Sequence, residues 1–252
     1  MELFEIVILG VLQGLTEFLP VSSSGHLVLG QYILGIKSPG NTLEILFHFG
    51  TLGSVVFVFF DEIKNIFVTI DKKPTQKLLV FISIATLPAM FVGLLFRHEI
   101  NLLFDSLDSV GYALCLTGLI LIISIFSNNK KINFSYHSSL VIGLVQAFAI
   151  IPGISRSGFT IVVSLFLGIS PKKSAKFSFL LSIPIIFGAG LLSFFDLQNE
   201  NFFTFSTIMT AILSSFFVGI LALKGLLKLL EQGKFYFFGI YCIFIGIISI
   251  LV

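Results

Sequence analysis

The sequence predicts an all-α integral membrane protein with six transmembrane helices and two broken, re-entrant helical hairpins, arranged as an inverted-topology repeat. Hydrophobic residues make up 56% of the 252 residues and charged residues only 11%, against roughly 45–50% and about 25% in soluble domains. The apolar stretches are continuous rather than alternating, which favours membrane helices over an outer-membrane barrel. The net charge of +2 is too small to indicate a nucleic-acid partner. Because the first basic residue is Lys37, we expect no cleaved signal peptide.

Six apolar segments are long enough to cross the hydrocarbon core of a bilayer, which takes roughly 17–25 helical residues. They lie at 43–60, 77–96, 109–126, 174–195, 205–223 and 235–252. Two further apolar stretches, 3–35 and 138–169, are interrupted in the middle by Pro, Gly and Ser. Because Pro removes a backbone donor and Gly-Ser clusters favour turns, each is expected to form two half-helices joined by a loop that enters and leaves on the same side.

An internal repeat relates the two broken stretches, which align when the chain is shifted by 133 residues. The matching pairs are Gly10 with Gly143, Gln13 with Gln146, Ser22 with Ser155, Ser24 with Ser157, and Gly25 with Gly158. The single membrane domain, 1–252, therefore divides into halves at 1–127 and 128–252, each with one broken hairpin and three crossings. Because three is odd, the second half is expected to be inserted upside down relative to the first.

The basic residues indicate the orientation in the membrane. If the broken stretches return without crossing, only Lys37 and Arg97 fall on the side of the N-terminus, and twelve lysines fall on the other side. The positive-inside rule makes the lysine-rich side cytoplasmic and places both termini outside. The twelve are Lys64, Lys72, Lys73, Lys77, Lys130, Lys131, Lys172, Lys173, Lys176, Lys224, Lys228 and Lys234.

Glu17 and Arg156 are charged residues that lie deep within the two broken stretches. A charge at the centre of a bilayer costs on the order of 2.5–3.5 kcal/mol, so each is a candidate functional residue. A structural ion pair that holds the two hairpins together is the alternative. Two half-helices that begin at the tips would also direct backbone N–H groups and positive dipole ends at an anion. Hydroxyl side chains surround both charges, and hydroxyls with an Arg and helix N-termini suit phosphate oxygens.

Gln13 and Glu17 are spaced i,i+4 and share a helix face. Their oxygens could hold a hard cation such as Mg²⁺ or Ca²⁺ that also bridges substrate phosphates, although this spacing alone occurs by chance in many helices. His26 follows the serine run by two residues and is a candidate general acid-base group. A packing role is the alternative for this histidine.

The two interrupted segments closely resemble the signature motifs of the undecaprenyl-diphosphate phosphatases, the bacitracin-resistance proteins of bacterial inner membranes. The first reads QGLTEFLPVSSSGHL over 13–27, and the second reads PGISRSGFT over 152–160. The resemblance spans the whole chain and includes milder matches at 47–51, 85–89 and 179–184. The family has Glu or Gln at the opening position of the first motif, where Gln13 carries one negative charge fewer than a Glu would.

This resemblance implies hydrolysis of undecaprenyl diphosphate to undecaprenyl phosphate and inorganic phosphate. The reaction would recycle the lipid carrier for peptidoglycan and other cell-wall synthesis and give resistance to bacitracin. Glu17, Ser23, His26 and Arg156 are implied to be catalytic, with a divalent cation, Mg²⁺ or Ca²⁺, held by Gln13 and Glu17. The implied substrate-binding residues are Ser22, Ser24, Gly25, Ser155, Ser157 and Thr160.

The sequence leaves three routes open for the reaction. Ser23 is the favoured nucleophile, with Glu17 as its base and His26 protonating or orienting the leaving oxygen. His26 acting through a phosphohistidine and direct attack by water are the rivals. Glu44 and His48, spaced i,i+4, either line the substrate entrance or are solvated at the end of a helix.

A lipid-phosphate transporter or flippase is the competing function, because inverted repeats are typical of alternating-access carriers and fold alone cannot separate the two. The expected partners are undecaprenyl diphosphate and membrane lipid, with no nucleic acid, and a homodimer is left open. The expected location is the bacterial inner membrane, with several crossings and the active site open toward the outer leaflet.

Overall fold

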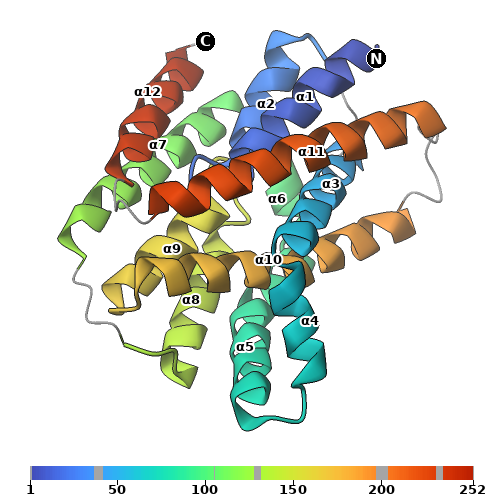
Figure 1. Ribbon diagram of the computed structural model, residues 1–252. Coiled ribbons are helices and arrows are strands. Elements are labelled where there is room, and N and C mark those ends of the chain that lie inside the picture. The colour runs from blue at the N-terminus through green and yellow to red at the C-terminus, as the bar shows by residue number, and fades with distance from the viewer. Residues whose placement is uncertain are drawn as a thin grey trace.

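A computed structural model describes residues 2–36, 42–104, 106–127, 132–196, 204–230 and 235–251. All the regular elements within these ranges are helices (Figure 1). This confirms the predicted all-α class. Lys37, Lys130, Lys131 and Lys234, which entered the prediction of orientation, lie outside the described residues.

Both interrupted stretches form pairs of short helices, as predicted. The first pair is α1 (Leu3–Thr16) and α2 (Ser23–Ile33), and the second is α8 (Tyr136–Phe148) and α9 (Arg156–Phe166). The two helices of each pair pack against each other. With 14, 11, 13 and 11 residues and a rise of about 1.5 Å per residue, none is long enough to cross a core of about 30 Å.

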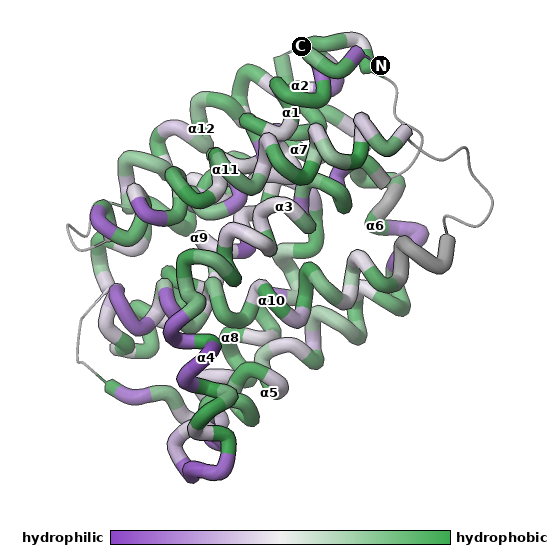
Figure 2. The backbone as a smooth tube through the Cα atoms, turned by 45° about the vertical axis from the view of Figure 1, so that its right-hand side comes forward, coloured by the Kyte–Doolittle hydropathy of each residue, from purple (hydrophilic) through white to green (hydrophobic). Residues whose placement is uncertain are grey.

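Four helices are long and apolar enough to cross a membrane. They are α5 (Lys73–Leu95), α7 (Leu107–Ile123, extended by the 3₁₀ turn η1, Ser124–Phe126), α10 (Pro171–Asp196) and α11 (Phe205–Leu230). Their bodies are largely hydrophobic, whereas hydrophilic residues gather at the turn between α4 and α5 (Figure 2). The chain therefore has the helices of a multi-pass membrane protein.

The remaining helices differ from the six predicted crossings. The stretch predicted to cross at 43–60 forms α3 (Thr42–Val58) and α4 (Phe60–Val68), which meet at a bend of 70° and count as a fifth candidate crossing only when taken together. At 16 residues, α12 (Tyr236–Leu251) falls just short of an upright crossing. The short helices α4 and α6 (Arg97–Phe104) were not anticipated.

Small residues allow the long helices to pack closely. Helices α7 and α12 lie side by side (Figure 1), and a Cβ atom added at Gly118 would lie only 2.5 Å from the carbonyl oxygen of Gly239. Gly111 and Gly246 make the same kind of contact about two helical turns away, where an added Cβ on Gly111 would lie 2.8 Å from the Gly246 oxygen. Glycine is used here because close backbone approach stabilises helix pairs in a membrane.

The lysine-bearing ends of several helices contact one another. Lys176 near the start of α10 pairs with Glu62 on α4 at 3.3 Å, and Lys224 near the end of α11 lies over the ring of Phe57 at 5.9 Å. These contacts bring ends of α3, α4, α10 and α11 together.

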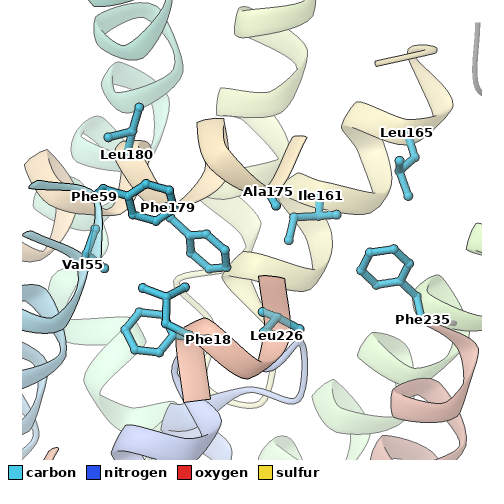
Figure 3. Close-up of a cluster of buried hydrophobic side chains, with 11 residues drawn as sticks. Phe18, Val55, Phe59, Ile161, Leu165, Ala175, Phe179, Leu180, Leu226 and Phe235 are labelled. Atoms are coloured by element: carbon cyan, nitrogen blue, oxygen red, sulfur yellow. The ribbon is translucent and has the colours of Figure 1, made fainter. Parts of the chain in front are cut away.

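The largest buried apolar cluster lies directly beside the two broken hairpins (Figure 3). Phe18, which follows α1, packs edge-on against Phe179 of α10 with ring centroids 5.8 Å apart, and both side chains are fully buried. Glu17 and Ser178 immediately precede these two phenylalanines in the chain. The cluster therefore gives the adjoining polar residues a rigid backing.

Candidate functional site

The tip of the first hairpin places a carboxylate and three serines between α1 and α2. Glu17 caps the C-terminus of α1, and Ser22 caps the N-terminus of α2, where its hydroxyl accepts the N–H of Gly25 at 3.3 Å. Ser22 has a φ of +69°, a left-handed conformation that non-glycine residues rarely adopt and that is found most often at functional sites. Ser23, the first residue of α2, follows this constrained cap.

The tip of the second hairpin has a similar construction. Ser155 caps α9 by accepting the N–H of Gly158 at 3.1 Å, and Arg156 is the first residue of the helix. Gly153 has a φ of +94°, which glycine adopts without strain. Thr117 of α7 holds this turn, since its hydroxyl donates to the Gly153 carbonyl at 2.9 Å and accepts the N–H of Ser155 at 3.1 Å.

The two tips contact each other directly. A Cβ atom on Gly25 would lie 3.0 Å from the Cα of Gly153, so only glycine permits this approach. The N–H of Gly153 donates to the Ser24 hydroxyl at 3.4 Å, and the Ser157 hydroxyl donates to the Leu19 carbonyl at 3.5 Å. Two segments more than a hundred residues apart therefore form one continuous site.

The carboxylate of Glu17 joins the reactive groups of both tips. Its Oε1 accepts a hydrogen bond from Nη2 of Arg156 at 2.6 Å, and its Oε2 accepts the hydroxyl of Ser23 at 2.6 Å. Only 6% of the Glu17 side chain and 15% of the Arg156 side chain are exposed, and breaking such a buried pair is costly. The ion pair between the two hairpins is therefore present, and its carboxylate also accepts a hydrogen bond from Ser23.

Arg156 is fixed from a second helix. Its Nη1 donates to the Ser178 carbonyl of α10 at 3.3 Å, and the Ser178 hydroxyl lies 2.7 Å from that of Thr160. The other N–H groups of the guanidinium have no hydrogen-bond partner among the residues that the structure describes. These donors are available to an oxyanion that enters the partly open site.

Helix α3 contributes His48, for which the sequence left open a place at the substrate entrance or at a solvated helix end. The Nδ1 atom of His48 lies within hydrogen-bond distance of the Gln13 amide and 3.8 Å from Oε2 of Glu17. His48 therefore lies against the site rather than at a solvated helix end. Glu44, one turn earlier, is buried and accepts a hydrogen bond from Gln31 at 3.3 Å.

His26 contacts α12 through Tyr241. Its Nδ1 lies 2.7 Å from the Ser22 carbonyl and its Nε2 lies 2.8 Å from the hydroxyl of Tyr241, whose ring stacks on the imidazole at 5.6 Å. Because a carbonyl only accepts, the neutral ring carries its hydrogen on Nδ1, and Nε2 accepts from Tyr241. Neither Tyr241 nor Ser178 carried any signal in the sequence, since each is brought to the site by packing of a distant helix.

The hydroxyls predicted to act in catalysis or substrate binding fall into two groups. Ser23 and Ser24 are partly exposed and can meet a ligand. The others are almost fully buried and make hydrogen bonds that cap or brace the half-helices. This second group consists of Ser22, Ser155, Ser157 and Thr160.

The residues expected to hold a cation suit that role by their donor chemistry. Gln13 is fully buried, donates from its amide nitrogen to Glu17 Oε2 at 3.0 Å, and leaves its own Oε1 buried with no hydrogen-bond partner. Within the described ranges, no three His, Cys, Asp or Glu side chains form a closed metal cage. One carboxylate with a nearby amide oxygen fits a cation that takes most of its remaining ligands from substrate phosphates.

Comparison with known proteins agrees with the motifs. A family model described as bacitracin resistance protein BacA matches residues 6–248. The undecaprenyl-diphosphatases of Halothermothrix orenii and Desulforapulum autotrophicum are 41% and 42% identical, with 100% of this chain and 98% of each relative aligned. Undecaprenyl-diphosphatase 1 of Bacillus cereus is 36% identical over 97% of this chain and 96% of its own length.

Proposed function

The chain belongs to the bacitracin resistance protein BacA family, and on this premise we propose that it hydrolyses undecaprenyl diphosphate to undecaprenyl phosphate and inorganic phosphate. The product is the lipid carrier that cell-wall synthesis reuses, and its regeneration gives resistance to bacitracin. The observation that carries this function is the carboxylate of Glu17, which bonds the hydroxyl of Ser23 and the guanidinium of Arg156 at 2.6 Å each. One base thus connects a nucleophile with a phosphate-binding cation.

A transporter or flippase is less well supported by this arrangement. A carrier needs a pocket that binds and releases a headgroup, whereas a buried carboxylate bonded to a serine hydroxyl supplies a reactive pair. The curated relatives carry the name of a hydrolase.

The proposed reaction begins when the diphosphate headgroup enters beside Arg156. The free N–H groups of the guanidinium bind the terminal phosphoryl oxygens, and the N–H groups at the starts of α2 and α9 add partial positive charge. Phosphoryl transfer depends mainly on such positioning and charge stabilisation. The hydrogen bonds of Arg156 to Glu17 and Ser178 hold the fork in one orientation for this purpose.

Ser23 then attacks the terminal phosphorus. Its proton passes to Glu17, the Oγ–P bond forms, and the bond from phosphorus to the bridging oxygen breaks, releasing undecaprenyl phosphate. Water hydrolyses the phosphoserine and returns the proton, giving inorganic phosphate and free enzyme. The geometry favours Ser23 over His26 as nucleophile, because the Ser23 hydroxyl already donates to a carboxylate that can take its proton, whereas Nε2 of His26 is bonded to Tyr241.

His26 and the cation complete the proposal. When the Tyr241 hydroxyl turns away, Nε2 of His26 becomes available to orient or protonate the leaving oxygen. Gln13 and Glu17 would hold a divalent cation, Mg²⁺ or Ca²⁺, which when bound neutralises phosphate charge.

The membrane arrangement is also part of the proposal. It consists of six crossings in the bacterial inner membrane, with inverted halves 1–127 and 128–252, both termini outside, and the site open toward the outer leaflet. Helix pairing supports the repeat, because α1 packs on α11 of the other half as α8 packs on α5. The contacts of Lys176 and Lys224 with Glu62 and Phe57 support a common cytoplasmic end. The oligomeric state stays a prediction.

Phosphate release from undecaprenyl diphosphate by the purified chain in detergent tests this function. Detergent removes the two membrane compartments, so release of inorganic phosphate reports hydrolysis and never transport. We expect turnover that falls when EDTA is added and that is lost in Ser23→Ala. No phosphate release from folded protein, combined with movement of the lipid across vesicles, would favour the transporter instead.

A further inference from the structure

Three side chains from two helices converge beside Ser23. Gln13 and Glu17 lie on and just after α1, and His48 lies on α3. The Gln13 amide nitrogen bonds Glu17 Oε2 at 3.0 Å and lies within hydrogen-bond distance of Nδ1 of His48, which is 3.8 Å from the same Oε2. Because an amide nitrogen only donates, Nδ1 directs its lone pair at this point.

The amide oxygen of Gln13 has no partner in this arrangement. Gln13 is fully buried, and its Oε1 accepts no hydrogen bond from the described residues, which is unfavourable for a buried polar atom. A half-turn of the side-chain amide would exchange its nitrogen and oxygen. The oxygen would then lie beside Glu17 Oε2 and His48 Nδ1, so three potential ligand atoms would converge at one point where a divalent cation can bind them.

The second half of the chain provides an internal comparison. Gln146, which matches Gln13 in the repeat, also has a buried Oε1 without a partner, and its amide nitrogen donates to the Ala85 carbonyl at 3.0 Å. Among the described residues, no carboxylate or imidazole bonds Gln146. The residue that matches Glu17 in the repeat is Ile150, which is apolar. The convergence of a carboxylate and an imidazole, rather than the unpaired amide oxygen alone, thus distinguishes the site at Gln13.

We infer that His48 is a metal ligand that completes, with Gln13 and Glu17, a site for a first-row divalent ion such as Mn²⁺ in preference to Mg²⁺ or Ca²⁺. The inference rests on the proposed cation at Gln13 and Glu17 and adds a nitrogen donor to it. Magnesium and calcium take oxygen ligands almost exclusively, whereas imidazole raises the affinity for first-row transition ions. The imidazole of His48 also replaces binding strength that a second carboxylate at position 13 would supply.

The position of His48 suits loading of such an ion. Its side chain is 27% exposed, against 6% for Glu17, so an ion can reach the imidazole before the buried carboxylate. The remaining coordination positions would be filled by water or by phosphate oxygens. Ser23 bonds the same carboxylate oxygen, which puts the bound ion next to the terminal phosphate of the substrate.

Manganese binding to the purified full-length chain tests the inference. Electron paramagnetic resonance measures free and bound Mn²⁺, and electron–nuclear double resonance detects an imidazole ¹⁴N bonded to it. We expect one Mn²⁺ per chain, retained against an excess of Mg²⁺, with a clear ¹⁴N coupling. In His48→Gln the coupling should vanish and Mn²⁺ affinity should fall at least about tenfold, because even loss of an outer-shell partner of a ligand costs that much. Affinity for Mg²⁺ should hardly change.

Two further variants keep the test independent of folding defects. His137→Gln alters an exposed histidine at the start of α8 and should leave Mn²⁺ binding and the ¹⁴N coupling intact. Gln13→Glu adds a carboxylate, so it should strengthen binding of Mg²⁺ more than binding of Mn²⁺. The preference for Mn²⁺ over Mg²⁺ should therefore become smaller, while the ¹⁴N coupling of His48 to Mn²⁺ persists. A ¹⁴N coupling that persists in His48→Gln, or equal affinity of the wild-type chain for Mn²⁺ and Mg²⁺, would overturn the inference.

Phosphate release measured with Mg²⁺ on the same preparation separates this inference from the proposed function. If phosphate is released but Mn²⁺ shows no ¹⁴N coupling, His48 is not a ligand and the hydrolase function stands. Mn²⁺ bound through His48 without turnover under any divalent ion would keep the site and reject the hydrolase.

Discussion

The two hairpin tips have the same construction but carry different chemistry. In each, a serine caps a new half-helix, and the residue after the cap is Ser23 in the first tip and Arg156 in the second. These two residues match in the 133-residue repeat, yet one is a hydroxyl and the other a cation. Glu17 has Ile150 as its counterpart, so only the first tip holds a base.

This difference shows how a repeated element can form an active site. Two identical tips would bring together either two hydroxyls without a cation or two cations that repel each other. Divergence at two matched positions, Ser23 with Arg156 and Glu17 with Ile150, instead places a nucleophile and a phosphate-binding group on the two oxygens of one carboxylate. The repeat supplies the shape, and its departures from symmetry supply the reaction.

Replacing the shared carboxylate should have the largest effect. Glu17→Gln removes the base for Ser23 and leaves Arg156 buried without its partner, so we expect kcat for phosphate release to fall roughly 10³-fold or more. The melting temperature should fall as well, because an unpaired buried charge destabilises the fold. Steady-state kinetics and thermal unfolding of the purified variant measure both effects. Activity within tenfold of wild type would remove Glu17 from the chemistry.

Substitution of the cation in the second tip tests the other side of the comparison. Arg156→Lys keeps the charge near Glu17 but loses the planar fork that binds phosphate at two points. We expect the chain to fold with kcat/KM reduced about 10²- to 10³-fold, the range found when a positioned donor to a developing charge is lost. Near-normal turnover would show that charge alone suffices at this position.

The contact between the tips is tested by a glycine. Gly25→Ala places a methyl group 3.0 Å from the Gly153 backbone, so the tips must separate, at a cost of about 1–3 kcal/mol in the free energy of unfolding. Thermal unfolding and phosphate release should both decline. Gly188→Ala is the matched control, because a Cβ there meets nothing within 4 Å. Equal behaviour of the two variants would contradict the close contact.

The smallest effect is expected at the tyrosine that holds His26. Tyr241→Phe keeps the stacked ring and removes only the hydroxyl bonded to Nε2. The hydroxyl must leave Nε2 before His26 can act, so Tyr241→Phe spares the breaking of a hydrogen bond of about 1 kcal/mol, or roughly fivefold in rate. We therefore expect kcat to rise by no more than this factor, with KM nearly unchanged. A rise in KM without any change in kcat would point to substrate binding by Tyr241 rather than positioning of His26.

The sequence predicted the helical architecture well where apolar length decides it. Both broken hairpins and the long helices α5, α7 and α10 lie close to their predicted ranges. Helix α11 runs seven residues beyond the predicted end at 223. The charges of Lys224 and Lys228 suggested a loop, but the aliphatic parts of lysine side chains can pack on apolar surface, so the helix continues as an amphipathic end. The bend between α3 and α4 was not predicted, because the hydropathy of a segment does not show whether its helix runs straight or changes direction.

The site was predictable only as far as motifs reach. Glu17, Ser23 and Arg156 stood out because charges and hydroxyls are rare in apolar stretches, and the structure brings them together. The contribution of His48 and Tyr241 depends on how α3 and α12 pack on the first hairpin, which local sequence does not encode. These residues are found only when the helices are assembled.

Trapping the phosphorylated enzyme tests most directly whether Ser23 is the nucleophile. In this role Glu17 activates Ser23, and Arg156 binds the phosphate that Ser23 attacks. Undecaprenyl diphosphate labelled in its terminal phosphate is mixed with purified protein, quenched within milliseconds, and the label is located by peptide mapping. We predict acid-stable phosphoserine at residue 23 that is absent in Ser23→Ala. Acid-labile phosphate on His26, or no labelled protein despite rapid turnover, would contradict this account.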